Sequence, residues 1–341
     1  MQDRHAPFMQ EALRLAQSQL GQTWPNPAVG AVIVKNGMVI AKGYTATGGR
    51  PHAETEALAK TSDTRGATLY VSLEPCAHHG RTPPCTDAII HAGITECVIA
   101  CRDTHPKVNG KGIAALQAAG INVIEGVCEA NARELNRGFF SLSEKKRPYI
   151  AMKIATSKDG KIAYPPGDDR KWITGEAARE EVHKLRSRYD AVLTGIGTVL
   201  ADDPLLTCRL PGMEHKSPVR VVLDRKGRLP EDCQLMKTKQ AVPLWVLGSS
   251  TIEQAVQKLA HEGITRLLVE AGQGVNTAFL QSGLVDRIYW VRAPFDIGIQ
   301  GIDAFFDMEA AIKLLATWRK LVYSAHPPDS CEIFEPCSPA S

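Results

Sequence analysis

The stretch RPHAETEAL, residues 50–58, places His52 two positions before Glu54 at the start of a segment that reads as helix. Taken alone, the pair has an ordinary interpretation, because a His and a Glu on the surface of a helix need no special function. The other interpretation is that both side chains act on one ligand. The choice depends on which further residues the chain can bring to them.

Two cysteines downstream favour a shared ligand. The segment SLEPCAHHGRTPPC, residues 72–85, contains Cys76 and Cys85, and each follows a proline. Because proline suits the first turn of a helix, we expect each cysteine to open a helix or to stand just ahead of one. A helix N-terminus lowers the pKa of a thiol, and the thiolate is the form that binds metal. The alternative is two structural cysteines and an unrelated surface His.

A His and two thiolates make a three-ligand set for tetrahedral zinc. Three protein ligands leave one position for water, whose pKa zinc lowers towards roughly 7, and this is typical of a catalytic site. Glu54 is short enough to reach that water without binding the metal, so it would carry the proton to a leaving amine. The ordered pattern indicates a zinc deaminase, although eight residues separate the cysteines here and two are usual.

Composition limits the remaining possibilities. A chain of 341 residues suggests about two domains. The net charge of +3 gives no argument for nucleic-acid binding. No apolar run is long enough to span a membrane, and the N-terminal segment lacks the apolar part of a signal peptide. We therefore expect a cytoplasmic protein whose nine cysteines serve as metal ligands or free thiols.

The first half alternates helix and strand patterns. Apolar residues recur at helical spacing within FMQEALRLAQSQL, and the strand-like runs AVGAVIV and MVIAKGY meet at Asn36-Gly37, a hairpin signal. We then expect, in order, a helix from about 52, a strand ATLYVSL, a helix near 84–92, a strand ECVIAC, a helix near 110–119 and a strand INVIE. A hairpin followed by this alternation predicts an α/β sandwich around a mixed sheet.

The charged stretch SLSEKKRPYI, 141–150, is the expected linker to a second α/β domain. We expect strands YIAMKIATS, DAVLTGI, VRVVLD, PLWVLG, TRLLVEAG and DRIYWVRA, and helices at about 175–188, 251–262 and 275–282. The segment CEIFE is expected as a last strand before a frayed end. Gly272 and Gly274 would let the backbone approach a pyrophosphate at a helix N-terminus, but the full dinucleotide fingerprint is absent.

Several motifs in one order resemble the bifunctional riboflavin-pathway family of pyrimidine deaminase–reductases. They cover most of residues 1–290 and read WPNPAVGAVIV, GRPHAETEAL, EPCAHHGRTPPC, MKIATSKDGKIA, KWITG, VLTGIGTVLADDPLLTCR and LLVEAGQG. The resemblance implies a cytidine-deaminase-like domain at 1–144 and a dihydrofolate-reductase-like domain at 145–341. It also implies zinc, NADPH, a small phosphoribosyl pyrimidine substrate and a homo-oligomer, either a dimer or a tetramer.

The family also implies roles for individual residues. The implied zinc ligands are His52, Cys76 and Cys85, with Glu54 as the proton carrier. Implied nucleotide contacts are Ala155, Trp172, Thr198, Asp202, Arg225 and the turn at 272–278 with Gly272, Gln273 and Gly274. Implied substrate contacts are Asn26, His78, Arg81, Lys153, Arg170, Arg186, Leu206, Arg209 and Glu270. Two of these residues also have an ordinary structural interpretation. Arg186 on a charged helix face would be a solvated residue, and Trp172 would be a core residue.

Three departures from the family pattern concern the second half. Lys158 stands where the family usually has an apolar residue, and Arg170 stands where it often has Ser. The region after VRAPF loses the family's usual character. Two further readings remain at this point: a nucleoside or nucleic-acid deaminase with an inactive or regulatory second domain, and a regulatory protein stabilised by zinc. Glu54 disfavours the last, because a structural zinc site needs no proton carrier.

Overall fold

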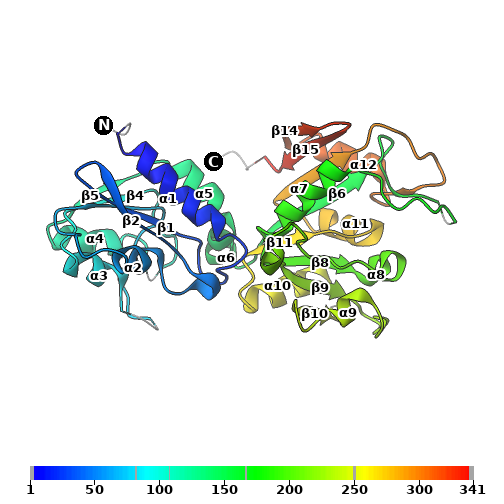
Figure 1. The fold of residues 1–341 in the computed structure, drawn as a ribbon. Coiled ribbons are helices and arrows are strands. Elements are labelled where there is room, and N and C mark those ends of the chain that lie inside the picture. Colours follow the sequence, from blue (N-terminus) through cyan, green and yellow to red (C-terminus); the bar gives the residue numbers. More distant parts are fainter. Residues whose placement is uncertain (1–3, 81–82, 107, 166, 249–250, 338–341) are drawn as a thin grey trace. The chain divides into compact units, whose positions relative to one another are not determined.

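The computed structural model describes residues 4–80, 83–106, 108–165, 167–248 and 251–337. The chain divides into two compact units, Met1–Arg147 and Pro148–Ser341, each with its own sheet (Figure 1). Within the described residues, no helix is long and apolar enough to cross a membrane.

The first unit has a five-stranded sheet in the order β2-β1-β3-β4-β5. The hairpin of β1 and β2 is confirmed: Asn36 and Gly37 both have positive φ, at 51° and 75°, as its tight turn requires. β1 is antiparallel to β2 and β3, whereas β3, β4 and β5 run parallel. The strands are β1 (Gly30–Lys35), β2 (Met38–Tyr44), β3 (Thr68–Val71), β4 (Glu96–Ile99) and β5 (Asn122–Glu125).

Helices cover both faces of this sheet, as the sequence predicts. They are α1 (Ala6–Ser18), α2 (Ala53–Leu58), α3 (Cys85–His91), α4 (Lys111–Ala118), α5 (Glu129–Leu135) and α6 (Arg137–Lys145). Gly30 lets α1 approach, since a Cβ there would lie 1.9 Å from the Ala12 carbonyl oxygen. Gly43 does the same for α2, where a Cβ would lie 2.2 Å from the Ala53 carbonyl oxygen. Gly43 pairs with Ala31, the neighbour of Gly30, so the two glycines face opposite sides of the sheet.

The division between the two units falls inside the predicted linker at 141–150, between Arg147 and Pro148, but most of that stretch belongs to α6 and β6. Helix α6 continues through Lys145, and β6 begins at Tyr149. Of the charged residues that suggested a linker, Glu144 and Lys145 are exposed at the end of α6, and Lys146 and Arg147 follow the helix. Phe140 and Ser141 on the same helix are buried. The charged end of α6 therefore resembled a flexible segment in the sequence. Local composition does not reveal that the same helix has a buried side.

The second unit has an eight-stranded sheet in the order β10-β9-β8-β11-β6-β12-β15-β14. The six strands from β10 to β12 run parallel, and β15 and β14 close the edge in antiparallel pairing. The strands are β6 (Tyr149–Thr156), β8 (Ala191–Gly195), β9 (Val219–Leu223), β10 (Leu244–Leu247), β11 (Arg266–Val269), β12 (Arg287–Arg292), β14 (Arg319–His326) and β15 (Asp329–Glu335). A two-stranded sheet pairs β7 (Lys161–Ala163) with β13 (Ile302–Asp303).

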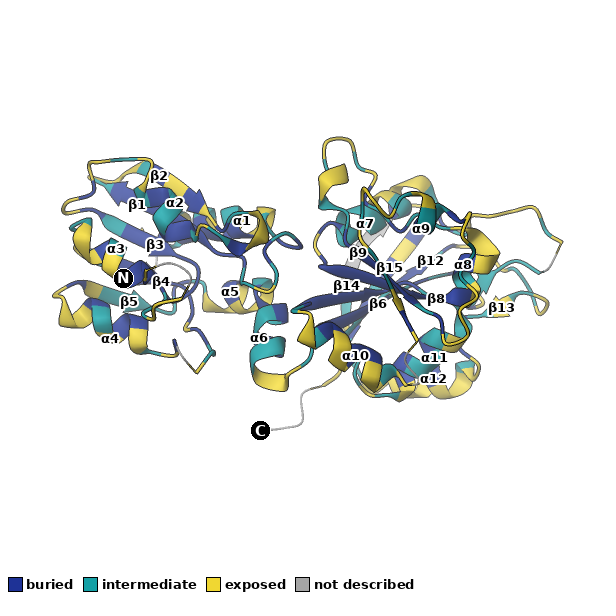
Figure 2. Cartoon of the chain, turned by 90° about the horizontal axis from the view of Figure 1, so that it is seen from below, coloured by how far each residue is buried: buried dark blue, intermediate teal, exposed yellow. Residues whose placement is uncertain are grey.

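The helices of this unit include the expected crossovers between parallel strands. They are α7 (Glu176–Arg186), α8 (Ile196–Asp202), α9 (Gln234–Lys237), α10 (Ile252–His261), α11 (Gln273–Gln281) and α12 (Met308–Leu315). Figure 2 shows the central strands buried and the helices exposed on their outer sides. Because parallel strands end at one edge of a sheet, the loops after β6, β8, β9 and β11 gather there, and ligands of open α/β sheets bind at such an edge.

The expected last strand, CEIFE, is confirmed and forms residues 331–335 of β15. Helix α12 and strand β14 were not expected from the sequence. β14 gains its place from pairing with β15, which in turn pairs with β12. The unusual region after VRAPF thus still completes the sheet.

Candidate active sites

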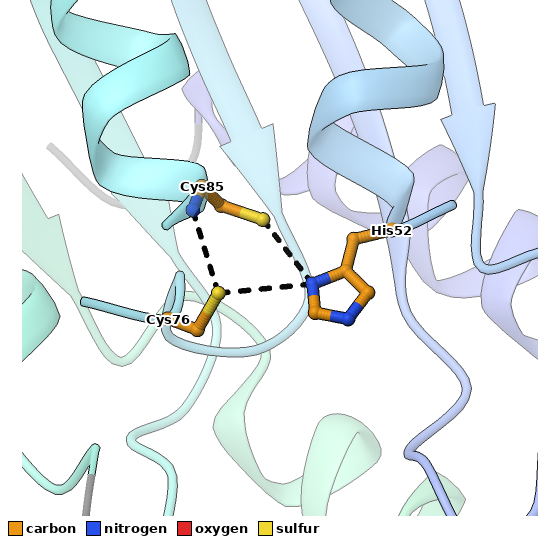
Figure 3. A group of neighbouring side chains, drawn as sticks. All are labelled: His52, Cys76 and Cys85. Carbon is orange, nitrogen blue, oxygen red and sulfur yellow. Dashed lines mark hydrogen bonds between the residues drawn. The ribbon is translucent and has the colours of Figure 1, made fainter. Parts of the chain in front are cut away.

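Three side chains in the first unit form a candidate metal centre (Figure 3). The donor atoms of His52, Cys76 and Cys85 all lie within 4.8 Å of one another. The His52 Nδ1 is 3.2 Å from the Cys85 Sγ and 3.7 Å from the Cys76 Sγ. Sequence positions up to 33 residues apart are therefore brought to one point, as the motif predicts.

Two helix starts and one loop position these donors. His52 is the residue just before α2, and Cys85 is the first residue of α3. Cys76 lies in the loop after β3, so the expectation that it opens or precedes a helix is wrong. Its sulfur nevertheless benefits from a helix start, because the backbone N–H of Cys85 donates to it at 3.4 Å. The long spacing between the cysteines allows this fold-back.

The chemistry of the centre suits a dication. The hydrogen bond from the Cys85 thiol, together with one from His52, lowers the pKa of Cys76 to about 4. Zinc–sulfur bonds of roughly 2.3 Å and zinc–nitrogen bonds of roughly 2.0 Å at tetrahedral angles place neighbouring donors roughly 3.5 Å apart. The two measured separations lie close to that value, so the residues fit zinc with one coordination position left over.

Glu54 lies beside the donors, in the first turn of α2, and is 4% exposed. Burial raises the pKa of its carboxyl group, while the positive charge of His52 opposes the increase. The carboxylate is also a hydrogen-bond neighbour of the Cys85 thiol. A buried carboxyl at this point can exchange protons with a ligand of the metal without being a ligand itself.

Of the three substrate contacts expected in this unit, the structure describes Asn26 and His78. Asn26 packs against Gly49, three residues before His52, and a Cβ on that glycine would lie 2.0 Å from the Asn26 Nδ2. His78 is exposed on the loop between the cysteines. Arg81 lies outside the described residues.

The sequence analysis missed Asp103. This residue is 6% exposed, and burial raises its pKa to about 6, with the charges of Glu74 and Cys76 adding to the increase. It follows the carboxyl end of β4, which runs parallel to β3. Its place in the loop after a predicted strand could have indicated it, because loops after neighbouring parallel strands meet at one sheet edge.

The second unit contains a cavity of about 2010 Å³ at the carboxyl ends of its parallel strands. All fourteen cofactor and substrate contacts that the sequence implies for this half line it. They are Lys153, Ala155, Arg170, Trp172, Arg186, Thr198, Asp202, Leu206, Arg209, Arg225, Glu270, Gly272, Gln273 and Gly274. Residues from β6, α7, α8, α11 and the loops between elements therefore converge on one space large enough for a dinucleotide and a second ligand.

An ion pair is buried in the wall of this cavity. The Arg186 Nε and Nη2 donate to the two carboxylate oxygens of Glu270 at 2.6 and 2.8 Å, and Nη1 donates to the Thr207 carbonyl at 3.1 Å. Arg186 is therefore not the solvated residue of a charged helix face. Burial alone would raise the pKa of Glu270, but the charge and hydrogen bonds of Arg186 hold it below its ordinary value.

Lys153 and His183 flank this pair. Burial lowers the pKa of Lys153, although the carboxylate of Glu270 opposes the decrease. Burial also lowers the pKa of His183, to about 4, and the charges of Arg186 and Arg209 contribute. His183 was missed in the sequence; it lies one helical turn before Arg186, so helical spacing was the available signal.

We expect Arg186→Met to destabilise the second unit by roughly 3–5 kcal/mol, because it leaves a buried carboxylate without its partner. Urea unfolding of wild type and variant measures the change. The control is Lys184→Met on the same helix, whose exposed ion pairs with Glu180 and Glu181 should contribute no more than about 1 kcal/mol. Equal losses in the two variants would contradict the importance of the buried pair.

The glycine-rich turn after β11 forms one side of the cavity. Helix α11 begins at Gln273, directly after Gly272, so its free backbone N–H groups face the sheet edge where an anion would lie. Gly195 allows α11 to pack closely, since a Cβ there would lie 2.7 Å from the Val275 Cγ2 and one of the two would have to shift. The expected turn and helix are confirmed.

Trp172 lies on the rim of the cavity and is 59% exposed, so it is not a core residue. The Arg179 guanidinium lies 5.0 Å from the centre of its ring. Arg170 is also exposed; it pairs with Asp168 and stacks 4.2 Å from the ring centre of Tyr164. An exposed indole on a cavity rim is available to a planar ligand.

Comparisons with known proteins agree with this division of the chain. Residues 2–101 match the cytidine and deoxycytidylate deaminase zinc-binding region, and residues 148–325 match the RibD C-terminal domain. The riboflavin biosynthesis protein RibD of Aquifex aeolicus is 42% identical over 326 residues, covering 87% of this chain and 91% of that protein. That of Escherichia coli K12 is 38% identical over 330 residues, covering 87% and 89%.

Two solved structures are similar to this chain over nearly its full length. Acinetobacter baumannii RibD superposes with a TM-score of 0.90 at 37% identity, covering 99% of this chain and 100% of that chain. A diaminohydroxyphosphoribosylaminopyrimidine deaminase/5-amino-6-(5-phosphoribosylamino)uracil reductase from Thermotoga maritima gives 0.89 at 37% identity, covering 98% and 99%.

Fold and sites together define a zinc-dependent deaminase domain followed by an NADPH-dependent reductase domain. These two activities in one chain exclude the reading of a nucleic-acid deaminase with an inactive second domain, as well as the regulatory reading. The chain belongs to the RibD family of bifunctional riboflavin biosynthesis enzymes.

Proposed function

We propose that the first unit deaminates 2,5-diamino-6-(5-phosphoribosylamino)pyrimidin-4(3H)-one at the centre of His52, Cys76 and Cys85. The second unit then reduces the ribosyl side chain of the product to ribityl. The observation that supports this most is the buried Glu54 beside three converging donors, because a structural metal site has no use for it. Asn26, His78 and Arg81 are the proposed substrate contacts.

Glu54 performs the proton transfers of deamination. His52, Cys76 and Cys85 would hold zinc, which would supply a water molecule whose pKa is lowered towards neutrality. Glu54 is placed to accept the proton of the attacking water, whose oxygen adds to the ring carbon that carries the amino group. The same carboxyl then gives the proton to the amino nitrogen, and ammonia leaves. Burial of Glu54 keeps bulk water from competing for this proton.

The cavity of the second unit performs the reduction. The ring-opened ribosylamine is an imine, and NADPH supplies the hydride that reduces its carbon. Lys153 and Glu270 are the groups placed to manage the proton that the imine nitrogen gains. Arg209 and Arg170 remain as phosphate and substrate contacts, together with Leu206. Since three of the Arg186 N–H groups are already bonded within the protein, its main task is to hold Glu270.

The nucleotide contacts proposed for the same cavity are Ala155, Trp172, Thr198, Asp202, Arg225 and the Gly272–Gln273–Gly274 turn. We propose deaminase residues 1–144 and reductase residues 145–341 as the two catalytic parts. A cytoplasmic location fits nine free cysteines. A homo-oligomer, dimer or tetramer, fits the exposed apolar side chains Ile299 and Phe306 of the second unit, which light scattering can test.

Turnover of the diaminopyrimidine phosphate with and without NADPH tests the whole proposal. Ammonia should be released in both reactions, whereas NADPH should be oxidised only after deamination. Ammonia release without any later NADPH oxidation would contradict the reductase half. NADPH oxidation without ammonia release would contradict the proposed order.

We expect the reductase to prefer NADPH over NADH and Arg225 to contribute to this preference. Arg225 is exposed on the turn after β9 and lines the cavity, together with Lys226 and Arg228. An arginine there can bind the 2′-phosphate as a fork, and NADH has no group to lose. Steady-state kinetics of Arg225→Ala should show a KM for NADPH raised about tenfold and a KM for NADH nearly unchanged.

The alternative for Arg225 is a solvated hairpin tip. In that case the variant would affect neither nucleotide. Equal effects on both nucleotides would also remove Arg225 from the phosphate site, and a wild-type preference for NADH would overturn the prediction as a whole.

A further inference from the structure

A buried asparagine outside both matched domains reaches back into the deaminase. Asn136 lies at the junction of α5 and α6 and is 3% exposed. Its Nδ2 donates to the Ala28 carbonyl at 3.0 Å, and the Ala28 N–H donates to its Oδ1 at 3.1 Å. The side-chain amide thus pairs with both backbone groups of one residue, 108 positions away in the sequence.

Two prolines lie in the loop that receives these bonds. Pro25 and Pro27 carry no N–H group, so two of the residues around Asn26 cannot donate a backbone hydrogen bond. Thr23 holds Asn26 locally: the Asn26 N–H donates to the Thr23 carbonyl at 3.0 Å, and the Thr23 hydroxyl donates to the Asn26 carbonyl at 3.1 Å. The Asn136 amide adds a long-range anchor at Ala28, next to the bonds that Val29 makes with Thr45.

This loop packs against the segment that leads to the metal centre. The Asn26 side chain fills the space beside Gly49, which has no Cβ, and the Gly48 N–H donates to the Gln22 carbonyl at 2.8 Å. His52 follows three positions after Gly49. Contacts thus run continuously from Asn136 through Ala28 and Asn26 to the backbone just before the first metal donor.

The helices that carry Asn136 are firmly part of the first unit. They lie between the matched regions 2–101 and 148–325. Ala132 of α5 and Phe140 of α6 belong to the buried core of the first unit, and α5 contacts α1. The segment after the zinc-binding region therefore packs into the core of the first unit, from which a side chain can position a loop.

We infer that Asn136 is a positioning residue of the deaminase, which holds the loop 23–28 so that Asn26 meets the pyrimidine. The inference rests on the proposed role of Asn26 in substrate binding. The physical reason is that a buried amide pair is costly to break, and that an error of about 1 Å in a contacting group can cost 10²-fold in rate. The segment between the two matched regions is thus a working part of the deaminase.

The test uses the full-length zinc enzyme and two activities in one chain. Asn136→Ala should raise the KM for deamination about tenfold, with a smaller change in kcat, because ground-state binding is lost. Zinc content and reduction of separately supplied deaminated substrate should stay at wild-type values. The matched control is Ser141→Ala on α6, which removes a partly buried hydrogen bond from a buried serine to the Arg147 carbonyl (3.0 Å) without touching Ala28. Its deamination KM should be unchanged.

A second variant keeps the test decisive if Asn136→Ala does not fold. Asn136→Leu has nearly the same shape and no charge, but it neither donates to the Ala28 carbonyl nor accepts from the Ala28 N–H. Packing is largely retained and both hydrogen bonds are lost, so a raised KM in this variant reports loop position. A wild-type deamination KM in Asn136→Leu, in a protein with full zinc, would overturn the inference.

Asn26→Ala separates this inference from the proposed function. If Asn26→Ala raises the KM for deamination and the Asn136 variants do not, the inference alone fails. If Asn26→Ala has a wild-type KM, the substrate role of Asn26 fails, and the inference fails with it. We expect Asn26→Ala and the Asn136 variants to raise the KM for deamination, and the Ser141→Ala control to leave it unchanged.

Discussion

Replacing Glu54 by Gln should lower the rate of deamination about 10³–10⁴-fold while zinc remains bound. A positioned acid–base group contributes roughly 10²–10⁴-fold, and here one carboxyl serves two proton transfers. The Gln side chain has the same size, so the buried space beside the donors stays filled. Ammonia release and metal analysis on the same sample measure the two halves of the prediction.

The second activity of the chain provides the control for Glu54→Gln. Reduction of separately supplied deaminated substrate should proceed at the wild-type rate, because Glu54 belongs to the other unit. A variant that released ammonia at a near-normal rate would show that Glu54 is not the proton carrier. Loss of zinc in the variant would instead make Glu54 part of the metal site.

Replacing both Cys76 and Cys85 by Ser should remove zinc and deamination together. The centre would keep one strong donor, His52, and hydroxyls do not replace thiolates as zinc ligands. Metal analysis of purified protein should show about one zinc per wild-type chain and almost none in the double variant. Deamination should fall below detection.

The matched control for this variant is Cys97→Ser with Cys101→Ser. These cysteines are also buried in the first unit but are not among the three donors. Their replacement tests whether loss of buried thiols alone releases the metal, so zinc should be retained. Full zinc occupancy in the Cys76 and Cys85 double variant would refute the assigned ligand set.

The sequence alone determined the residue types and order of the metal centre. Few side chains bind zinc, and His52, Glu54, Cys76 and Cys85 stand in an order that carries the chemistry without knowledge of the fold. The alternation of helices and strands was also readable, because the apolar pattern of each element has a local period. The Asn36-Gly37 hairpin is the clearest case, since its backbone conformation is set by two adjacent residues.

Only the tertiary structure decided how residues from distant segments are used. Cys76 opens no helix, but its sulfur accepts a hydrogen bond from the N–H of Cys85, the first residue of α3. In the same way, α6 is a packed helix where the charged residues suggested a linker. Arg186 is paired with Glu270 across 84 positions, and Asn136 with Ala28 across 108. Burial and partner choice depend on which surfaces meet when the sheets form, and no local period of the sequence records that meeting.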